Sequence, residues 1–194
     1  MRSYLNHMIF TLPIFHDGAL VAFSSSMAHW PDVGGVLGGV TRDIYAEDLQ
    51  LPFVKICQAG RQAPERTAII CANCRLPDRA MGDFRAEMAV IRTGERRVSR
   101  LLECDGGPTF TESAWLIFDQ SERLARAAVR TIPDGVYEAE SFMDDDGVAL
   151  GRYIPIRVRV EVCGDAIPFD LSGVGAQVAG YFNAVQFTVL CLMF

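Results

Sequence analysis

Residues 9–23 read IFTLPIFHDGALVAF, and this stretch decides how the first part of the chain folds. Two apolar runs, residues 9–15 and 19–23, are separated by His16-Asp17-Gly18. An Asp-Gly pair readily takes the positive φ angles of a type I′ turn, which joins two strands of a twisted hairpin. The sequence therefore predicts a β-hairpin here.

A glycine-rich segment follows the hairpin. Residues 24–40 contain AHWPDVGGVLGG, with glycines at 34, 35, 38 and 39. So many glycines disfavour a helix, and we expect a loop. The next stretch, residues 43–56, is mixed, with a short strand expected at 53–56.

Two helices are expected in the middle of the chain. Residues 64–104 read as largely helical, because Met81, Phe84, Met88 and Ile91 recur at spacings of three and four and share one face. A second helix is expected to start after Thr109, which has capping-box spacing to Glu112. It should stop at residues 133–135, Pro-Asp-Gly.

The last third is expected to be β-structure. A strand at residues 137–142 precedes an acidic turn, and residues 154–162 alternate between apolar and charged side chains. Alternation continues over residues 167–171, where Pro168 indicates an edge strand. The predicted class is α+β, with β-hairpins, an antiparallel meander and two amphipathic helices. We expect a single partial domain over residues 1–194, incomplete at both ends.

Composition excludes several kinds of partner. The 194 residues carry a net charge of −6 and no basic run, so neither nucleic acid nor an anionic membrane is an expected partner. The apolar residues 185–194 are too few to cross a bilayer, which needs about 20. No secretory signal is evident, so the six cysteines are expected to be reduced thiols in a cytoplasmic protein. Cys71 and Cys74 form one CxxC pair, too few ligands for structural zinc.

The candidate chemistry lies in Ala28-His29-Trp30-Pro31-Asp32-Val33-Gly34-Gly35. Imidazole and carboxylate are ordinary donors to divalent metals, and glycine backbone can approach a ligand closely. The alternative is that His29 and Asp32 hydrogen-bond to each other across a loop. His7 could add a ligand, whereas His16 is expected to be a solvated turn residue.

Other motifs carry less chemistry. The turn Asp144-Asp145-Asp146-Gly147 lacks the remaining ligands of a calcium loop, so a solvated acidic turn is expected. Residues 169–173, FDLSG, lack the glycine that precedes a nucleophilic serine in hydrolase elbows. No GxxxxGK[ST] loop is present, so nothing predicts that this chain binds ATP.

Several of these stretches, taken in order, resemble the hydantoinase B/oxoprolinase family. AHWPDVGGVLGG is similar to AHxxDVGGxxPGS, with Leu37 and Gly39 replacing proline and serine. Residues 43–52 resemble EIYxEGLxIP, and residues 73–87 resemble NxRxPxxxxGDLxAQ. Residues 133–147 match PDGxYxxxxxxDxDG, residues 169–173 match DFSG, and residues 183–184 match NA. The resemblance covers residues from about 9 to 184.

The resemblance implies a function. Family members pair with a nucleotide-binding A-type subunit, which holds ATP, and together they open a cyclic amide such as 5-oxoproline or a hydantoin. It implies a hetero-oligomer and a divalent metal (Mg, Mn or Zn). The implied catalytic residues are His29, Asp32, Asp83 and Arg85; the implied substrate-binding residues are Gly34, Gly35 and Ser172; the implied metal ligands are His29 and His7.

The departures from the family pattern suggest alternatives. The family has an upstream NDPYxGGTHLxD stretch, whereas residues 2–7 here read RSYLNH and lack the aspartate. We therefore expect an incomplete metal site in a fragment that is inactive alone. The alternatives are a non-catalytic remnant that keeps only the fold or a docking role, and a subunit of a related ATP-dependent ketone carboxylase.

Overall fold

The computed structural model describes residues 5–36, 41, 43–180 and 182–183. These residues form an α+β structure, as predicted, and they divide into two compact units. One unit contains the described residues up to Gly106, and the other contains Gly107–Asn183. No helix in the described residues is long and apolar enough to cross a membrane.

The predicted hairpin is confirmed, but it is longer than expected. β1 (His7–His16) pairs antiparallel with β2 (Ala19–His29). The turn residues Asp17 and Gly18 have φ angles of 50° and 78°, as a type I′ turn requires. The expectation of a loop from residue 24 is wrong for residues 24–29, because backbone pairing with β1 continues to the His7–His29 pair.

The predicted helix over residues 64–104 is two helices, α1 (Pro64–Asn73) and α2 (Pro77–Asp105). Leu76 precedes a proline, which disfavours helical backbone, and the chain breaks there. α2 continues without a break through Gly94, although glycine lowers helix propensity. A Cβ at Gly94 would lie 2.2 Å from Ser24 Oγ, so the glycine lets β2 approach the helix closely.

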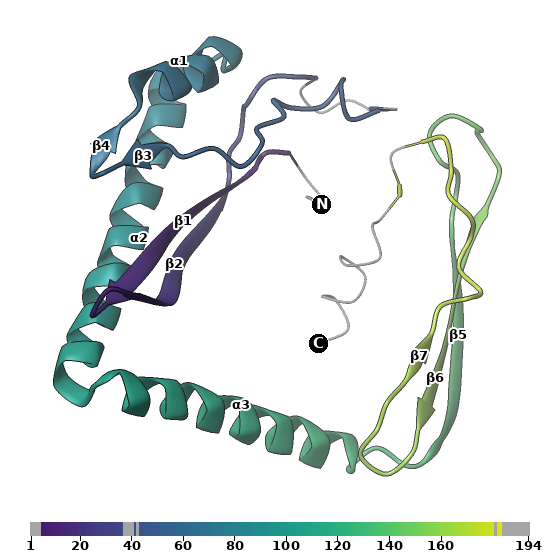
Figure 1. Cartoon of the computed structure of the whole chain (residues 1–194). Coiled ribbons are helices and arrows are strands. Elements are labelled where there is room, and N and C mark those ends of the chain that lie inside the picture. The colour runs from purple at the N-terminus through teal and green to yellow at the C-terminus, as the bar shows by residue number, and fades with distance from the viewer. Residues whose placement is uncertain (1–4, 37–40, 42, 181, 184–194) are drawn as a thin grey trace. The chain divides into compact units, whose positions relative to one another are not determined.

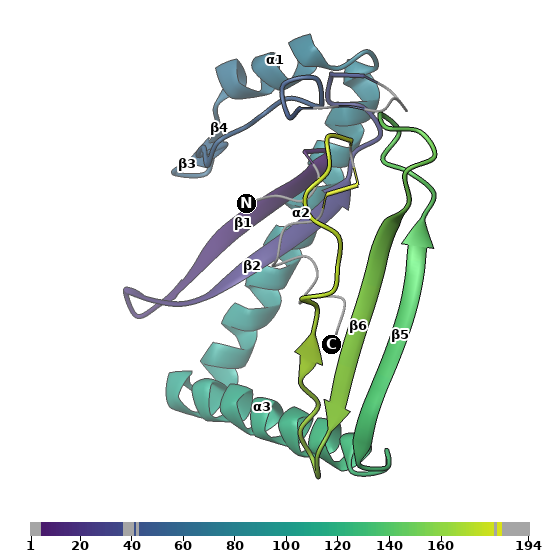
Figure 2. The same ribbon diagram turned by 90° about the vertical axis from the view of Figure 1, so that its right-hand side faces the viewer.

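The core of the first unit lies between the hairpin and α2, which run beside each other in both views (Figures 1 and 2). The predicted apolar face is confirmed: Phe84 and Ile91 are buried, and Met81 and Met88 pack against them. Phe10 contacts Phe84 edge to face, with ring centroids 5.3 Å apart. The other buried members of this cluster are Met8, Trp30, Val33, Ile70 and Ala80.

A small second hairpin replaces the strand that we expected at residues 53–56. β3 (Cys57–Gln58) pairs with β4 (Arg61–Gln62). Ala59 and Gly60 have φ angles of 49° and 76°, so the chain reverses there. The expected strand is wrong because the tight turn, rather than the apolar run before it, determines where pairing begins.

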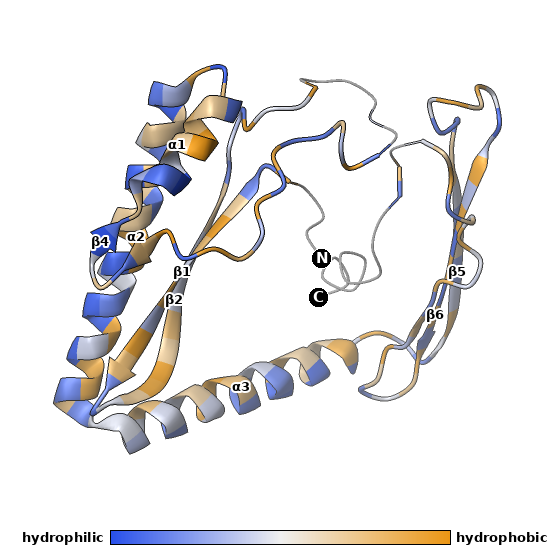
Figure 3. Cartoon of the chain, turned by 45° about the horizontal axis from the view of Figure 1, so that its top comes forward, coloured by the Kyte–Doolittle hydropathy of each residue, from blue (hydrophilic) through white to orange (hydrophobic). Residues whose placement is uncertain are grey.

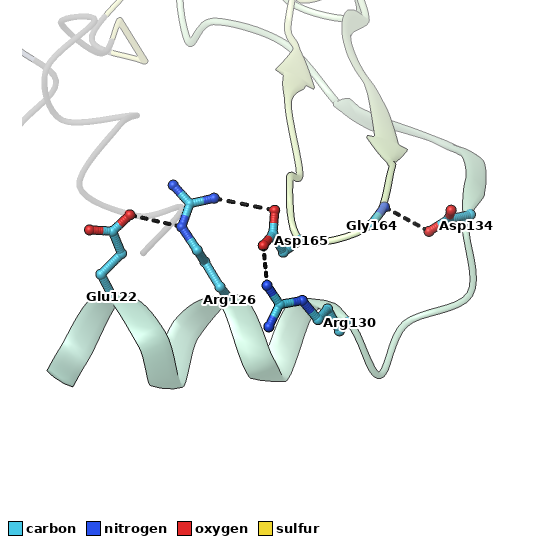
Figure 4. Close-up of polar contacts among 6 residues, drawn as sticks. All are labelled: Glu122, Arg126, Arg130, Asp134, Gly164 and Asp165. Atoms are coloured by element: carbon cyan, nitrogen blue, oxygen red, sulfur yellow. Dashed lines mark hydrogen bonds and ion pairs between the residues drawn. The ribbon is translucent and has the colours of Figure 1, made fainter. Parts of the chain in front are cut away.

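The second unit begins with α3 (Gly107–Val129). Because α3 starts before Thr109, that residue is not the N-cap and the predicted capping box is wrong. The helix carries alternating polar and apolar bands (Figure 3), yet none of its described residues is buried. Near its end, Arg126 and Arg130 both bind the Asp165 carboxylate, while Gly164 N–H donates to Asp134 (Figure 4). These contacts fix the helix end to the turn at residues 163–166.

The meander of the second unit is confirmed. β5 (Gly135–Met143), β6 (Ile154–Val162) and β7 (Phe169–Asp170) form a sheet in that order, so β7 is an edge strand. The acidic turn is not fully solvated, contrary to expectation. Asp146 is 6% exposed and accepts backbone N–H bonds from Val148, Ala149 and Gly180. Its carboxylate therefore connects two loops of this unit.

Candidate functional site

Two imidazoles meet at the open end of the first hairpin. His7 begins β1 and His29 ends β2, directly opposite in the strand register. His7 Nε2 lies 2.9 Å from His29 Nδ1, and the ring centroids are 4.7 Å apart. The Asn6 amide nitrogen lies 2.6 Å from His29 Nε2. The hairpin register therefore places two candidate ligands side by side.

The hydrogen bonds define one tautomer of His29. An amide NH2 group only donates, so with the Asn6 amide in this orientation His29 Nε2 accepts. His29 Nδ1 then carries the proton and donates it to His7 Nε2. The pKa of His7 is lowered, first by burial and then by the neighbouring His29. In this tautomer the lone pair on His29 Nε2 faces the Asn6 amide.

Asp32 pairs with Arg75 rather than with His29. Arg75 Nη1 lies 2.8 Å from Asp32 Oδ1, and the Arg75 backbone N–H donates to Asp32 Oδ2. The guanidinium also donates to the carbonyl oxygens of Gly34 and Gly35. Burial raises the pKa of Asp32, but bonds from the N–H groups of Arg75 and Gly34 and from the guanidinium hold it below its usual range.

The glycines at 34 and 35 let a second segment approach this loop. Leu49 N–H donates to Val33 O at 2.9 Å. Gly35 has a φ of +61°, and a Cβ there would lie 2.0 Å from Glu47 O. Beside this contact lies Asp48, whose pKa is raised first by burial and then by Glu47 and Asp32. The paired glycines thus serve close backbone packing.

Beneath the loop, Trp30 is fully buried, although its neighbour His29 is exposed. Trp30 Nε1 donates to Glu87 Oε1 on α2 at 2.6 Å. Its backbone N–H donates to Asn6 O at 2.9 Å. Trp30 therefore fastens the His29 segment both to the helix and to the residue that contacts the His29 ring.

The remaining predicted site residues lie far from the His29 loop in sequence. Asp83 is half-buried on α2, and its charge raises the pKa of the nearby Glu87. Arg85 is exposed on the same helix. Ser172 belongs to the second unit, where its N–H donates to Asp170 Oδ1 at 2.9 Å. The structure brings together His7, His29, Asp32, Gly34 and Gly35, and it adds Asn6, Arg75 and Glu87 to them.

Two of these additions, Arg75 and Glu87, lie in the stretch that resembles NxRxPxxxxGDLxAQ. Their roles were not predicted, because their partners Asp32 and Trp30 are 43 and 57 residues away. Nothing in the sequence pointed to Asn6. The cysteines, Cys57, Cys71, Cys74, Cys104 and Cys163, are free in the described part of the chain. Cys191 lies outside the described residues, as do Leu37 and Gly39.

A cavity of about 430 Å³ opens beside β1. It is lined by residues 8–13 of β1, by residues 51–59, and by Ile70, Met88 and Ile91. Its lining is mostly apolar and contains none of the predicted site residues. The His7–His29 pair is therefore a surface feature in this chain rather than the floor of this cavity.

Comparison with known proteins identifies the relatives of this chain. Residues 1–193 match the family model described as hydantoinase B/oxoprolinase. A protein of Pseudomonas sp. (strain NS671), named as the B-type subunit of a D-/L-hydantoinase, is 32% identical over 179 residues, covering 87% of this chain. The beta subunit of the caprolactamase of Pseudomonas jessenii is 31% identical over 169 residues, covering 85% of this chain. The chain spans 30% and 29% of the lengths of these two relatives.

Solved structures show the same fold. The ATP-dependent caprolactamase from Pseudomonas jessenii matches with a TM-score of 0.78 and 28% identity, over 85% of this chain and 29% of that one. A nucleotide-free acetone carboxylase matches with a TM-score of 0.87 over 95% of this chain and 26% of that one. At 15% identity, the second likeness concerns the fold alone.

Proposed function

Since the chain belongs to the hydantoinase B/oxoprolinase family, we propose that it is part of the B-type subunit of an ATP-dependent cyclic-amide hydrolase. Its partner in this proposal is a nucleotide-binding A-type subunit that holds ATP, and the complete enzyme is a hetero-oligomer in the cytoplasm. The observation that carries the proposal is the hydrogen-bonded His7–His29 pair beside the loop held by Arg75.

The chemistry follows from the poor reactivity of an amide carbonyl toward water. Phosphorylation of the amide oxygen, with ATP held by the partner, gives a more electrophilic carbon. The lone pair on His29 Nε2 accepts from the Asn6 amide in this structure, and once that amide turns away it can take a proton from the attacking water as the C–O bond forms. The same proton can return to the ring nitrogen of the substrate when the C–N bond breaks, which leaves an acyl phosphate. A second water then hydrolyses the acyl phosphate to the carboxylate and inorganic phosphate. His7 holds the His29 tautomer in this scheme, as the orienting group does in a catalytic triad.

Asp32 and the other predicted residues take supporting roles in this proposal. Asp32 shapes the loop through Arg75, and the backbone of Gly34 and Gly35 borders the substrate. Asp83 and Arg85 on α2, and Ser172 in the second unit, are further residues that we propose to act in the whole enzyme. These assignments rest on the family motifs that the residues match.

The described residues do not complete a site for Mg, Mn or Zn. They contain no group of three or more His, Cys, Asp or Glu side chains that could hold a metal ion. The two imidazoles alone are fewer than the three protein ligands that a catalytic zinc keeps. We therefore derive no step through a metal, although His7 and His29 are the side chains that we propose as ligands.

Two experiments test the proposal. Calorimetric titration with Zn²⁺ or Mn²⁺ should show that His29→Ala abolishes any binding, while His16→Ala, a matched change in the hairpin turn, leaves it unchanged. Equal binding by wild type and His29→Ala would remove His29 from the site. Co-expression with a candidate A-type subunit should give ATP hydrolysis that depends on a cyclic amide. Hydrolysis of ATP that depends on a ketone and bicarbonate instead would favour the carboxylase alternative.

A non-catalytic docking role is the second candidate, and one observation favours it. On α3, Trp115, Leu116, Ile117 and Phe118 are 57–64% exposed, so an apolar surface on this helix is open for a partner. Under this alternative the chain binds its A-type partner but supports no turnover. Co-purification without cyclic-amide-dependent ATP hydrolysis would favour it.

A further inference from the structure

Glu87 is a buried carboxyl group that the proposed chemistry does not use. It lies on α2, is 4% exposed, and accepts the Trp30 Nε1–H bond through Oε1. Its second oxygen, Oε2, is buried and makes no well-formed hydrogen bond among the described residues, although the Ser26 hydroxyl lies near the carboxyl group. A lone pair left unsatisfied on a buried carboxylate is costly, so the ionised form is poorly accommodated here.

Glu87 forms no ion pair with a cation in the described part of the chain, and Arg66 of α1 donates to Lys55 O instead. β1 and β2 contain no lysine or arginine, and their titratable residues are His7, His16 and His29. On α2 itself, Asp83 lies one turn earlier and adds a like charge, whereas Arg85 and Arg92 are exposed. Burial and Asp83 raise the pKa of Glu87, outweighing the opposing effects of the Trp30 hydrogen bond and of the nearby Ser26 hydroxyl.

We propose that Glu87 is a positioning residue: as an uncharged carboxylic acid it holds the Trp30 indole and thereby fixes the His29 imidazole. Trp30 follows His29 directly in the chain. The Trp30 backbone N–H donates to the backbone oxygen of Asn6, and the Asn6 side-chain amide contacts His29 Nε2. The Trp30 side chain thus connects Glu87 to the His29 backbone and, through Asn6, to His29 Nε2. The inference rests on the proposed function only in naming His29 as the group that is positioned.

Proton linkage gives the first test, made on the full chain. Because the pKa of Glu87 is raised in the folded state, its stabilising contribution is complete below the unfolded-state pKa and is lost as pH rises toward the folded-state pKa. Over that interval the unfolding constant of the wild type should gain up to about tenfold per pH unit from this group. Glu87→Gln, which keeps an acceptor for Trp30 and cannot ionise, should lose this slope. Glu103→Gln, at an exposed site on the same helix, should keep it.

Ring-nitrogen NMR of the histidines gives the second test, and it reports positioning rather than stability. The wild type should show His29 protonated on Nδ1, and Glu87→Gln should retain that signal. Glu87→Leu, which leaves the indole N–H without an acceptor, should lose the single-tautomer signal of His29. Neither readout uses metal binding or turnover, so a failure of the proposed function would leave both intact.

Two outcomes would overturn the proposal. One is a Glu87→Gln variant whose unfolding constant keeps the wild-type pH slope. The other is a folded Glu87→Leu variant with an unchanged His29 tautomer. If Glu87→Leu does not fold, the glutamine variant still decides the matter, because preserved stability and the preserved His29 signal support the proposal while their loss contradicts it.

Discussion

Replacing Arg75 by alanine should loosen the loop at residues 32–35 without unfolding the core. The guanidinium binds Asp32 and the carbonyl oxygens of Gly34 and Gly35, while the Arg75 backbone N–H bond to Asp32 survives the change. The Arg75 side chain is 48% exposed, so screening limits the ion pair to about 0.5 kcal/mol. The bond to Gly35 O adds about 1 kcal/mol, and the 3.4 Å contact with Gly34 O adds less. The expected loss is about 1.5–2 kcal/mol.

Urea denaturation followed by intrinsic fluorescence measures this loss, and limited proteolysis reports opening of the loop. Arg75→Lys keeps the charge but not the planar fork, so it should recover only the ion-pair part. Arg79→Ala, at an exposed position on α2, is the matched control and should change stability by less than about 0.5 kcal/mol. The reasoning is refuted if Arg75→Ala unfolds and is cleaved like the wild type, or if Arg75→Lys restores stability completely.

Three further predictions concern other contacts. Gly35→Ala should lower the free energy of unfolding in urea by more than about 2 kcal/mol, because the new Cβ would overlap Glu47 O. Gly18→Ala lies in open space and should lower it by only about 1 kcal/mol, because of the positive φ there. Equal losses would contradict this reasoning. Asp48→Asn should flatten the pH dependence of stability, because the raised pKa of Asp48 makes its contribution fade as pH rises above the unfolded-state value near about 4; an unchanged profile would show that Asp48 does not contribute to it. Asp146→Ala should lower the free energy of unfolding of the second unit by about 1–3 kcal/mol, because the backbone N–H groups of Val148 and Ala149 lose their acceptor. Hydrogen exchange at residues 148–149 measures this, and unchanged protection there would contradict it.

Local signals predicted much of the fold. The Asp17-Gly18 turn, the apolar face of α2 and the alternation of β6 are each determined within a few residues, and all three are confirmed. The predictions are wrong where a contact between residues far apart in the sequence determines the secondary structure. Residues 24–29 begin with three serines and read as the start of a loop, but pairing with β1 makes them a strand. Thr109 has capping-box spacing, yet α3 has already begun at Gly107.

The candidate site shows the same division. His29, Asp32 and the paired glycines could be singled out because they lie within seven consecutive residues. The predicted alternative, a bond between His29 and Asp32, does not describe the structure, since Asp32 pairs with Arg75 and His29 with His7. Both true partners lie far along the chain, at separations of 43 and 22 residues. No local pattern carries that information.

The turn at Asp17-Gly18 has a consequence a whole strand length away. Successive strand residues point to opposite sides, so a slip of one residue in the pairing would exchange inside for outside along the entire ribbon. At its far end, that exchange would bring an imidazole into the hydrocarbon interior and expel the indole beside it. The two-residue turn thus determines which of two adjacent aromatic rings is exposed to solvent. Lengthening the turn by one residue should remove His29 from the exposed side of the hairpin without changing any side chain of that segment.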